Sequence, residues 1–300
     1  MTVLKVEHLT KDFGHGRGIF DVNFEINKGE VLGFLGPNGA GKSTTIRHLM
    51  GFTKPGQGKV EINGFDCTNK PQEVMKYVGY LPGEVALPDD MTGGQFIKMM
   101  KAMRHIKDDR YLNHLIELFD LDYQGSMKKM SLGEKRKLAV VVAFMADPEI
   151  LILDEPTSGL DPVMQEKFIE FMVEEKRRGK TILLSSHIFP EVEATCDRIN
   201  IIKEGRIVAE VDAADLKNER QKNFQLGFTN PSNLAQAMSV FDNKKIVQPL
   251  VLEVTVAKER ISDFFKQLAD LKVIAINERR FNLEKYFLDF YRSDKVFEEI

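Results

Sequence analysis

The sequence predicts an α/β protein with a mostly parallel sheet, followed by a small α+β domain at its C-terminal end. Short apolar runs alternate with longer segments of helical periodicity, which indicates strand–helix–strand units. One run, Val31–Leu35, leads into a glycine-rich loop and a helical segment that begins at Lys42. After about residue 217 the elements become shorter and their order changes. We therefore expect two domains, over residues 1–216 and 217–300.

The composition is that of a soluble globular protein, with 43% hydrophobic and 29% charged residues among 300. A formal net charge of −3 offers no basic stripe, so we expect no nucleic acid partner. Cys67 and Cys196 lie far apart without metal-binding spacing, which is typical of reduced thiols in a cytosolic protein. The most apolar stretch, Leu138–Ala146, has about half the length needed to span a bilayer. If the protein works at a membrane, we expect another chain to supply the span.

The first domain is expected to contain an antiparallel β part and a helical subdomain beside the parallel sheet. The alternating segment Phe20–Ile26 reads as a half-buried strand, with Val3–Leu9 as its partner. Residues 85–148 are mostly helical in pattern and form the expected helical subdomain. Its methionine-rich part, Met91–Met130, indicates either core filling or an adaptable docking groove.

Further elements follow from caps and apolar runs. Ser131 and Glu134 form a capping-box pattern that predicts a helix ending before Pro148. Beyond residue 217, the order β-α-β-β-α-β predicts a ferredoxin-like arrangement with a closing helix over Asn282–Tyr291. The remaining expected elements of the first domain are two buried strands and the helix between them: Ile150–Leu153, Pro162–Arg178 and Thr181–Leu184.

The glycine-rich loop fits the phosphate-loop pattern, which ends in Gly-Lys-Ser or Gly-Lys-Thr. Backbone N–H groups that curl inward, with the positive end of the helix dipole behind them, form a nest for a polyphosphate. Lys42 is expected to reach the β- and γ-phosphates and the Ser43 hydroxyl to ligate Mg²⁺. The alternative is a plain glycine turn capping a core helix. The expected binding residues of the loop are Gly36, Pro37, Asn38, Gly39, Ala40, Gly41, Lys42, Ser43 and Thr44.

Two adjacent carboxylates follow a buried strand. Asp154 suits Mg²⁺, through water, and Glu155 suits polarising the water that attacks a γ-phosphate. Acidic residues that merely end a strand are the alternative. The segment Pro156–Asp161 directly behind them favours the catalytic interpretation.

With these motifs the sequence closely resembles the nucleotide-binding subunits of ATP-binding cassette (ABC) transporters, over about Val3 to Val211. Five motifs occur in the order typical of that family, which is more specific than any one of them. They are Gly36–Thr44 (Walker A), Ser131–Glu134 (signature), Leu151–Glu155 (Walker B), Ser158–Asp161 (D-loop) and His187 (H-loop).

The resemblance implies a head-to-tail homodimer that holds two ATP molecules. Each ATP would lie between the Walker A loop of one subunit and Ser131 and Gly133 of the other, with the D-loop residue Asp161 at the same site. His187 would hold the γ-phosphate and order the attacking water. Phe13 matches the aromatic that stacks on adenine; on the residues alone, it would face the core. Ser131 has the alternative of only capping its own helix.

Two departures from the family pattern concern the rate of hydrolysis more than ATP binding. The usual Q-loop glutamine is absent where Leu81-Pro82-Gly83-Glu84 stands, and Glu84 is the expected substitute as a Mg²⁺ ligand. The signature is reduced to Met130–Glu134. Thr92–Gln95 looks more like the consensus, but it lies too far before Asp154, so we interpret it as a decoy.

The expected function is that of an ATPase subunit of an ABC exporter, bound to a separately encoded transmembrane permease on the cytoplasmic face. The exporter direction comes from resemblance at Leu81–Glu84 and at the closing segment Asn282–Leu288. Two alternatives stay open. One is a soluble ABC ATPase that acts on ribosomes or DNA, and the other is a regulatory ATP sensor that hydrolyses slowly.

Overall fold

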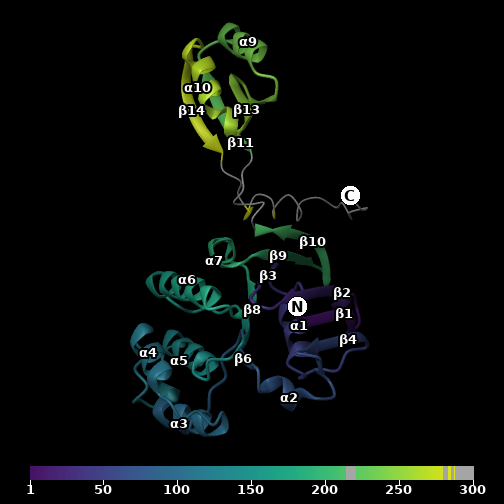
Figure 1. Ribbon diagram of the computed structural model, residues 1–300, viewed down its shortest axis with the longest axis vertical. Coiled ribbons are helices and arrows are strands. Elements are labelled where there is room, and N and C mark those ends of the chain that lie inside the picture. Colours follow the sequence, from purple (N-terminus) through teal and green to yellow (C-terminus); the bar gives the residue numbers. More distant parts are fainter. Residues whose placement is uncertain (214–220, 280–282, 285–286, 288–300) are drawn as a thin grey trace. The chain divides into compact units, whose positions relative to one another are not determined.

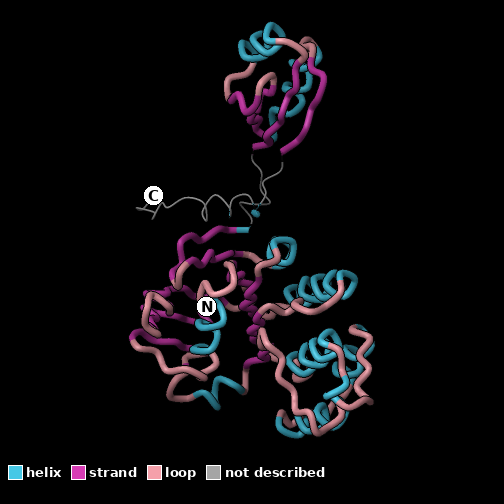
Figure 2. The backbone as a smooth tube through the Cα atoms, turned by 180° about the vertical axis from the view of Figure 1, so that it is seen from behind, coloured by secondary structure: helices cyan, strands magenta, loops and turns pink. Residues whose placement is uncertain are grey.

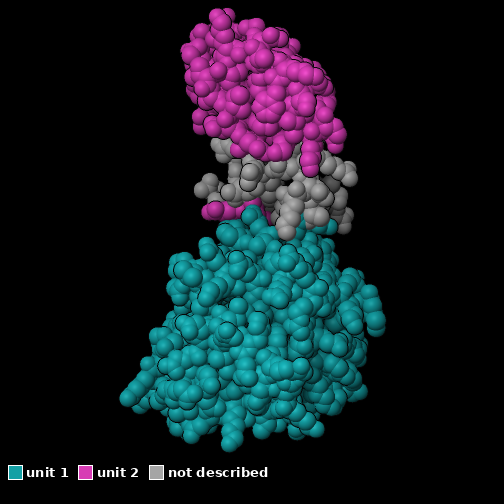
Figure 3. Space-filling model, turned by 60° about the vertical axis from the view of Figure 1, so that its left-hand side comes forward, with its two compact units in different colours: residues 1–213, 290–300 teal, residues 214–289 magenta. Residues whose placement is uncertain are grey.

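A computed structural model of the chain describes residues 1–213, 221–279, 283–284 and 287. These fall into two compact units, a large unit within residues 1–213 and a small unit within residues 221–287 (Figure 3). The expected boundary between residues 216 and 217 lies outside the described residues. Most of the expected closing segment Asn282–Tyr291 also lies outside them.

The large unit is built on a six-stranded sheet with the order β10-β9-β3-β8-β7-β6 (Figure 1). Five strands are parallel and only β10 runs antiparallel, against β9. Every residue of β3, β7 and β8 is buried, as expected for central parallel strands covered on both faces. The strands are β3 (Val31–Leu35), β6 (Val78–Leu81), β7 (Ile150–Asp154), β8 (Thr181–Ser186), β9 (Arg198–Lys203) and β10 (Arg206–Asp212).

A second, antiparallel sheet has the order β2-β1-β4-β5. Along β2 the side chains of Phe24 and Ile26 are buried and Glu25 is exposed, which confirms the predicted alternation. The Phe24 ring packs against Phe34 of the parallel sheet, with centroids 5.3 Å apart, so one hydrophobic core joins the two sheets. The strands are β1 (Thr2–Asp12), β2 (Gly18–Asn27), β4 (Gln57–Ile62) and β5 (Phe65–Asp66).

Helices surround these sheets, and α3, α4 and α5 gather into a helical subdomain (Figures 1 and 2). Phe119, Phe144, Phe168 and Phe171 pack ring against ring where α4, α5 and α6 meet, with centroids 4.9–6.4 Å apart. The helices of the large unit are α1 (Lys42–Leu49), α2 (Pro71–Met75), α3 (Gly93–Met103), α4 (Arg110–Leu118), α5 (Leu132–Phe144), α6 (Pro162–Arg177) and α7 (Phe189–Thr195), with a 3₁₀ turn at Met127–Lys129.

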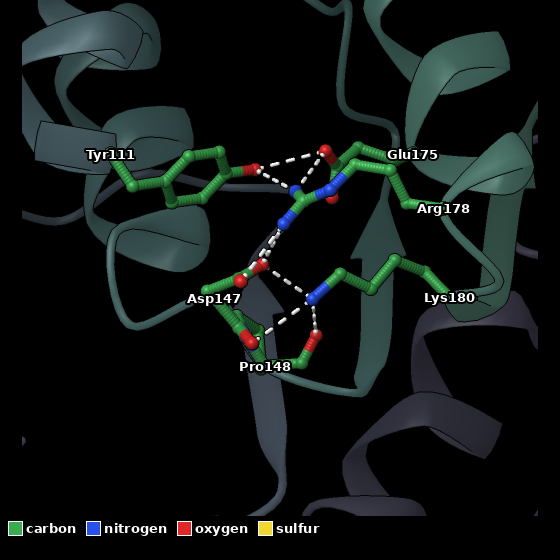
Figure 4. Close-up of polar contacts among 6 residues, drawn as sticks. All are labelled: Tyr111, Asp147, Pro148, Glu175, Arg178 and Lys180. Carbon is green, nitrogen blue, oxygen red and sulfur yellow. Dashed lines mark hydrogen bonds and ion pairs between the residues drawn. The ribbon is translucent and has the colours of Figure 1, made fainter.

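A network of polar and charged residues connects the helical subdomain to α6 and β8 (Figure 4). Tyr111 of α4 donates a hydrogen bond to the buried carboxylate of Glu175 at 3.0 Å, and Arg178 pairs with the same oxygen at 2.6 Å. Arg178 also forms two contacts, at 2.8 and 2.9 Å, with Asp147, which in turn binds Lys180 at 2.5 Å. The site is partly buried and contains both positive and negative side chains. Removing one of them would therefore leave the charge of its partner unpaired.

The small unit has one four-stranded antiparallel sheet with the order β12-β13-β11-β14. Its element order confirms the predicted β-α-β-β-α-β pattern. The helices bury an aromatic core, in which Phe224 stacks on Phe264 at 4.7 Å. The elements are β11 (Gln221–Phe228), α9 (Pro231–Val240), β12 (Lys244–Gln248), β13 (Val251–Ala257), a 3₁₀ turn at Lys258–Arg260, α10 (Ile261–Ala269) and β14 (Val273–Arg279).

Candidate functional site

The phosphate loop connects β3 to α1 and has the conformation that its glycines require. Gly39 and Gly41 adopt φ values of 81° and 114°, in the left-handed region that other residues avoid. A Cβ at Gly36 would lie 2.6 Å from the carbonyl oxygen of Ile202, so a side chain has no room there. The Ser43 side chain is exposed at the start of the helix. The loop is therefore a tight turn with a helix N-terminus behind it, the arrangement that binds anions.

The Lys42 ammonium lies at the mouth of this loop and is only 5% exposed. It donates to the carbonyl oxygens of Gly36 and Pro37, at 2.6 and 3.3 Å. Its Nζ also lies 3.0 Å from Oε1 of Glu155, so this pair joins Walker A to Walker B. An incoming phosphate would compete with Glu155 for the ammonium.

Glu155 also contacts His187, with 2.5 Å between Oε2 and Nδ1. The imidazole is about half exposed, at the end of β8, while Glu155 follows β7. Glu155 has a φ of 47°, and non-glycine residues in this region cluster at functional sites. The structure therefore brings together Lys42, Glu155 and His187 in one chain of polar contacts.

Asp154 lies beside this chain, at the end of β7, and is 3% exposed. The Ser185 hydroxyl donates to its Oδ1, and a Cβ at Gly83 would lie 3.1 Å from its Oδ2. Within the described part of the chain, no group of three or more His, Cys, Asp or Glu side chains could hold a metal by itself. The Ser43 hydroxyl and the Asp154 carboxylate are hard oxygen ligands, which fit Mg²⁺ when phosphate oxygens and water complete its shell.

The signature residues lie at the tip of α5. The Ser131 hydroxyl accepts a hydrogen bond from the Glu134 N–H at 3.2 Å, and the Glu134 carboxylate accepts one from the Ser131 N–H at 2.9 Å. This confirms the predicted capping box. A Cβ at Gly133 would lie 3.2 Å from the carbonyl oxygen of Gly159 in the D-loop. Ser131 is exposed, and Leu132 is 63% exposed, so the N-terminus of α5 is accessible to solvent.

The remaining predicted site residues, Asp161, Phe13 and Glu84, lie on three other segments of the large unit. Asp161 caps α6, accepting from the Met164 N–H at 3.0 Å. Phe13 follows β1 with its ring 58% exposed, so the core-facing alternative is wrong. Glu84 is exposed in the segment after β6. Thr92, the first residue of the decoy motif, caps α3 in a second capping box.

Sequence reasoning missed Arg136, which is 2% exposed and connects three segments of the site. Its guanidinium donates to the carbonyl oxygens of Ser158, at 2.9 Å, of Pro82, at 2.8 Å, and of Gly83. The signature helix is thereby tied to the D-loop and to the segment that replaces the Q-loop. The sequence gives no signal of this burial, because basic residues near the start of a helix are usually exposed.

Glu191 was also missed. It lies in α7, is 1% exposed, and accepts a hydrogen bond from the Ser186 hydroxyl at 2.5 Å, next to His187. Burial raises the pKa of Glu191 to about 7, and the negative charge of Glu155 acts in the same direction. Its polar contacts link α7 to the strand end that carries His187.

A glycine loop that opens a helix with lysine, together with two carboxylates at the end of another strand of the same parallel sheet, defines the class of phosphate-loop nucleoside triphosphatases. The family model described as ABC transporter matches residues 19–158. The chain is 31% identical to the uncharacterized ABC transporter ATP-binding protein YhcH of Bacillus subtilis, over 98% of this chain and 97% of the relative. The chain therefore belongs to the family of ABC transporter ATP-binding proteins.

Two further comparisons agree. The bacitracin transport ATP-binding protein BcrA of Bacillus licheniformis is 34% identical over 76% of each chain. A solved ATP-binding subunit of an ABC transporter superposes with a TM-score of 0.66 and 31% identity, covering 72% of this chain and 92% of that one. Both matches leave about a quarter of this chain uncovered.

Proposed function

We propose that the chain is the ATP-hydrolysing subunit of an ABC exporter and powers a separate membrane permease. The observation that supports this most is the contact chain Lys42–Glu155–His187 at the mouth of the phosphate loop. It brings together an ammonium, a carboxylate and an imidazole, which in the proposal bind the phosphates, the attacking water and the γ-phosphate. Phosphoryl transfer depends mainly on such positioning and charge stabilisation.

Each residue has a role in this proposal. Lys42 leaves Glu155 and binds the β- and γ-phosphates, while Ser43 and Asp154 would hold Mg²⁺, with Glu84 as a further ligand. Once released, Glu155 accepts a hydrogen bond from the attacking water, and His187 orients that water and the γ-phosphate. When bound, Mg²⁺ would neutralise part of the negative charge of the phosphates.

The proposed site needs a second copy of the chain. Ser131 and Gly133 lie at an exposed helix tip, and their contacts are with α5 itself and with the D-loop. A helix N-terminus at the surface favours the γ-phosphate of an ATP bound to another subunit. We propose a head-to-tail homodimer in which Asp161 and Phe13 complete the walls around the nucleotide, Phe13 by stacking on adenine.

The membrane permease is proposed to dock on a groove of about 690 Å³ in the large unit. Met50, Phe52, Met75, Met100 and Met103 line it, and Phe52 and Met103 are 51% and 67% exposed. Flexible methionine side chains adapt to a partner surface. An adaptable docking groove was one of the two interpretations of the methionine-rich segment Met91–Met130.

A separate membrane chain is part of the proposal because no helix among the described residues is long and apolar enough to cross a bilayer. The proposed location is therefore the cytoplasmic face of the membrane, bound through the permease. The name of the Bacillus licheniformis relative, bacitracin transport ATP-binding protein, supports a role in transport, and the proposed exporter direction rests on the resemblance at Leu81–Glu84.

Steady-state ATPase assays of the full chain test the proposal. We expect turnover in the wild type that disappears in Glu155→Gln, because the amide cannot accept the proton of the attacking water. Equal, near-zero rates in both proteins, together with retained ATP binding, would favour the regulatory ATP sensor. Addition of the purified permease in lipid vesicles should raise the wild-type rate only.

A further inference from the structure

Two successive hydroxyl groups hold the end of β8, directly before His187. The Ser185 hydroxyl donates to the carboxylate of Asp154. The Ser186 hydroxyl donates to Oε2 of Glu191 in α7, at 2.5 Å. Successive side chains of a strand point to opposite faces of its sheet, so the strand end is held on both sides.

The backbone turns at His187. The Ser186 hydroxyl also accepts a hydrogen bond from the N–H of Ile188 at 2.9 Å, so His187 is the central residue of a hydrogen-bonded turn. A hydroxyl that accepts in this direction keeps one proton to donate, and Glu191 accepts it. The imidazole is about half exposed, and among the residues that the structure describes its ring has a polar contact with Glu155 alone. Because packing leaves half of this ring free, its direction depends on the turn beneath it.

Glu191 accepts this hydrogen bond from a well-anchored position. It lies in the first turn of α7 and is 1% exposed. The Thr195 hydroxyl donates to the carbonyl oxygen of Glu191 at 2.7 Å. α7 packs closely against β3, since a Cβ at Gly33 would lie 2.8 Å from the sulfur of Cys196. The group that holds the turn is therefore anchored against the strand that leads into the phosphate loop.

A buried carboxyl group is costly unless a cation pairs with it. Burial is the main cause that raises the pKa of Glu191 to about 7, and the charge of Glu155 adds to it. The hydroxyls of Ser186 and Thr157 act in the opposite direction, and none of these groups is a cation. For the packing of α7, a leucine of similar size would serve as well. What the glutamate adds is an oxygen that accepts from Ser186.

We propose that Glu191 is a positioning residue for His187. Its carboxyl oxygen holds the Ser186 hydroxyl, and this hydroxyl fixes the turn that directs the imidazole toward the γ-phosphate and the attacking water. This role rests on the proposed function, in which His187 orients that water. Glu191 itself touches neither the nucleotide nor the water. The neutral and the ionised carboxyl group can both accept from Ser186, so the role holds in either protonation state.

Steady-state kinetics of full-chain variants test this role. Glu191→Leu fills a similar space without an acceptor, so we expect kcat to fall about ten- to hundredfold as the imidazole loses its direction. The KM for ATP should change less than about threefold, because the phosphate loop is untouched. Glu191→Gln keeps an oxygen that accepts from Ser186 and should restore most of the rate. Glu166→Leu, at an exposed position of α6, is the control and should leave kcat unchanged.

Two double variants separate positioning from a purely structural role. Ser186→Ala breaks the same hydrogen bond, so the double variant with Glu191→Leu should be no slower than the slower of the two single variants. In a His187→Ala background, Glu191→Leu should leave the residual rate unchanged, because the group that it positions is gone. An equal loss of kcat in that background, or a Glu191→Gln variant as slow as Glu191→Leu, would overturn the proposal.

Nuclear magnetic resonance tests the direction of the ring without any turnover. At about pH 8 an ordinary histidine is neutral, and a carboxylate only accepts, so the contact with Glu155 favours the Nδ1–H tautomer of His187. Two-bond ¹H–¹⁵N spectra of the full chain, labelled with ¹⁵N-histidine, report this tautomer, and His187→Ala identifies the signal.

We expect the Nδ1–H tautomer in the wild type and in Glu191→Gln, and its loss in Glu191→Leu. Retention of this tautomer in Glu191→Leu would overturn the proposal. A wild type that shows the expected tautomer but no turnover would contradict the proposed function and not the hold of Glu191 on the ring.

Discussion

Replacing Arg136 by methionine tests how the signature helix is held. The change keeps an unbranched side chain but removes the donors to the carbonyl oxygens of Ser158, Pro82 and Gly83. All three acceptors then lose a charged partner in a site where the arginine is 2% exposed. We therefore expect the large unit to be less stable. We also expect the N-terminus of α5, which carries Ser131, to lose its fixed position.

The magnitude follows from two opposing terms. A hydrogen bond to a charged group contributes about 1.5 to 3 kcal/mol, and Arg136 makes three. Burial of the guanidinium costs several kcal/mol, and the same burial lowers the pKa of Arg136. The difference leaves a net loss of about 2 to 4 kcal/mol. For a unit of this size, that corresponds to a fall in Tm of about 4 to 16 °C.

Differential scanning calorimetry of the full chain measures the transition of the large unit. The neighbouring substitution Lys137→Met removes one hydrogen bond, to the exposed carbonyl oxygen of Asp120, and serves as the control with a change below about 0.5 kcal/mol. A fall in Tm of less than about 2 °C for Arg136→Met would show that the three hydrogen bonds contribute no net stability, contrary to this prediction.

Three further outcomes are expected. Lys42→Ala should abolish turnover, since it removes the side-chain cation that the proposal assigns to the β- and γ-phosphates; unchanged turnover in the ATPase assay would exclude this role. Because the pKa of Glu191 is raised to about 7, the folded chain keeps a proton that the unfolded chain releases, so stability falls by about 3 kcal/mol as the pH rises from about 4 to 8. Urea unfolding should show this slope disappearing in Glu191→Gln but not in a variant of the exposed Glu166, and a retained slope would contradict it. Tyr111→Phe removes the hydrogen bond donated to Glu175 and the one accepted from Arg178, and should cost about 1 to 2 kcal/mol by urea unfolding, whereas no loss would show that the two bonds add nothing.

The features that local sequence determines were predictable. Apolar runs predicted the buried strands, the glycine pattern predicted the loop before Lys42, and the Ser131–Glu134 spacing predicted a capping box. Each of these depends on residues within a few positions of one another. Thr92 and Gln95 have the same spacing and also form a capping box. It was not recognised because this segment was compared only with the signature consensus.

Contacts between distant segments were not predictable. Arg136 binds residues 22 and 54 positions away, and the Ser185 contact with Asp154 spans 31 positions. The methionines illustrate the same limit, because Met127 is fully buried while Met103 is 67% exposed. Helical periodicity gives the spacing of a face, but only the packing of other elements decides whether that face is covered.

We propose that ATP is hydrolysed between the phosphate loop of one copy and the signature helix of another. Mixing two inactive variants, Lys42→Ala and Ser131→Arg, tests it most directly. A mixed dimer contains one site built from the intact loop of the second variant and the intact Ser131 of the first. We expect the mixture to hydrolyse ATP although neither variant does so alone. If the mixture stays inactive while mass spectrometry shows that mixed dimers form, the shared site is contradicted.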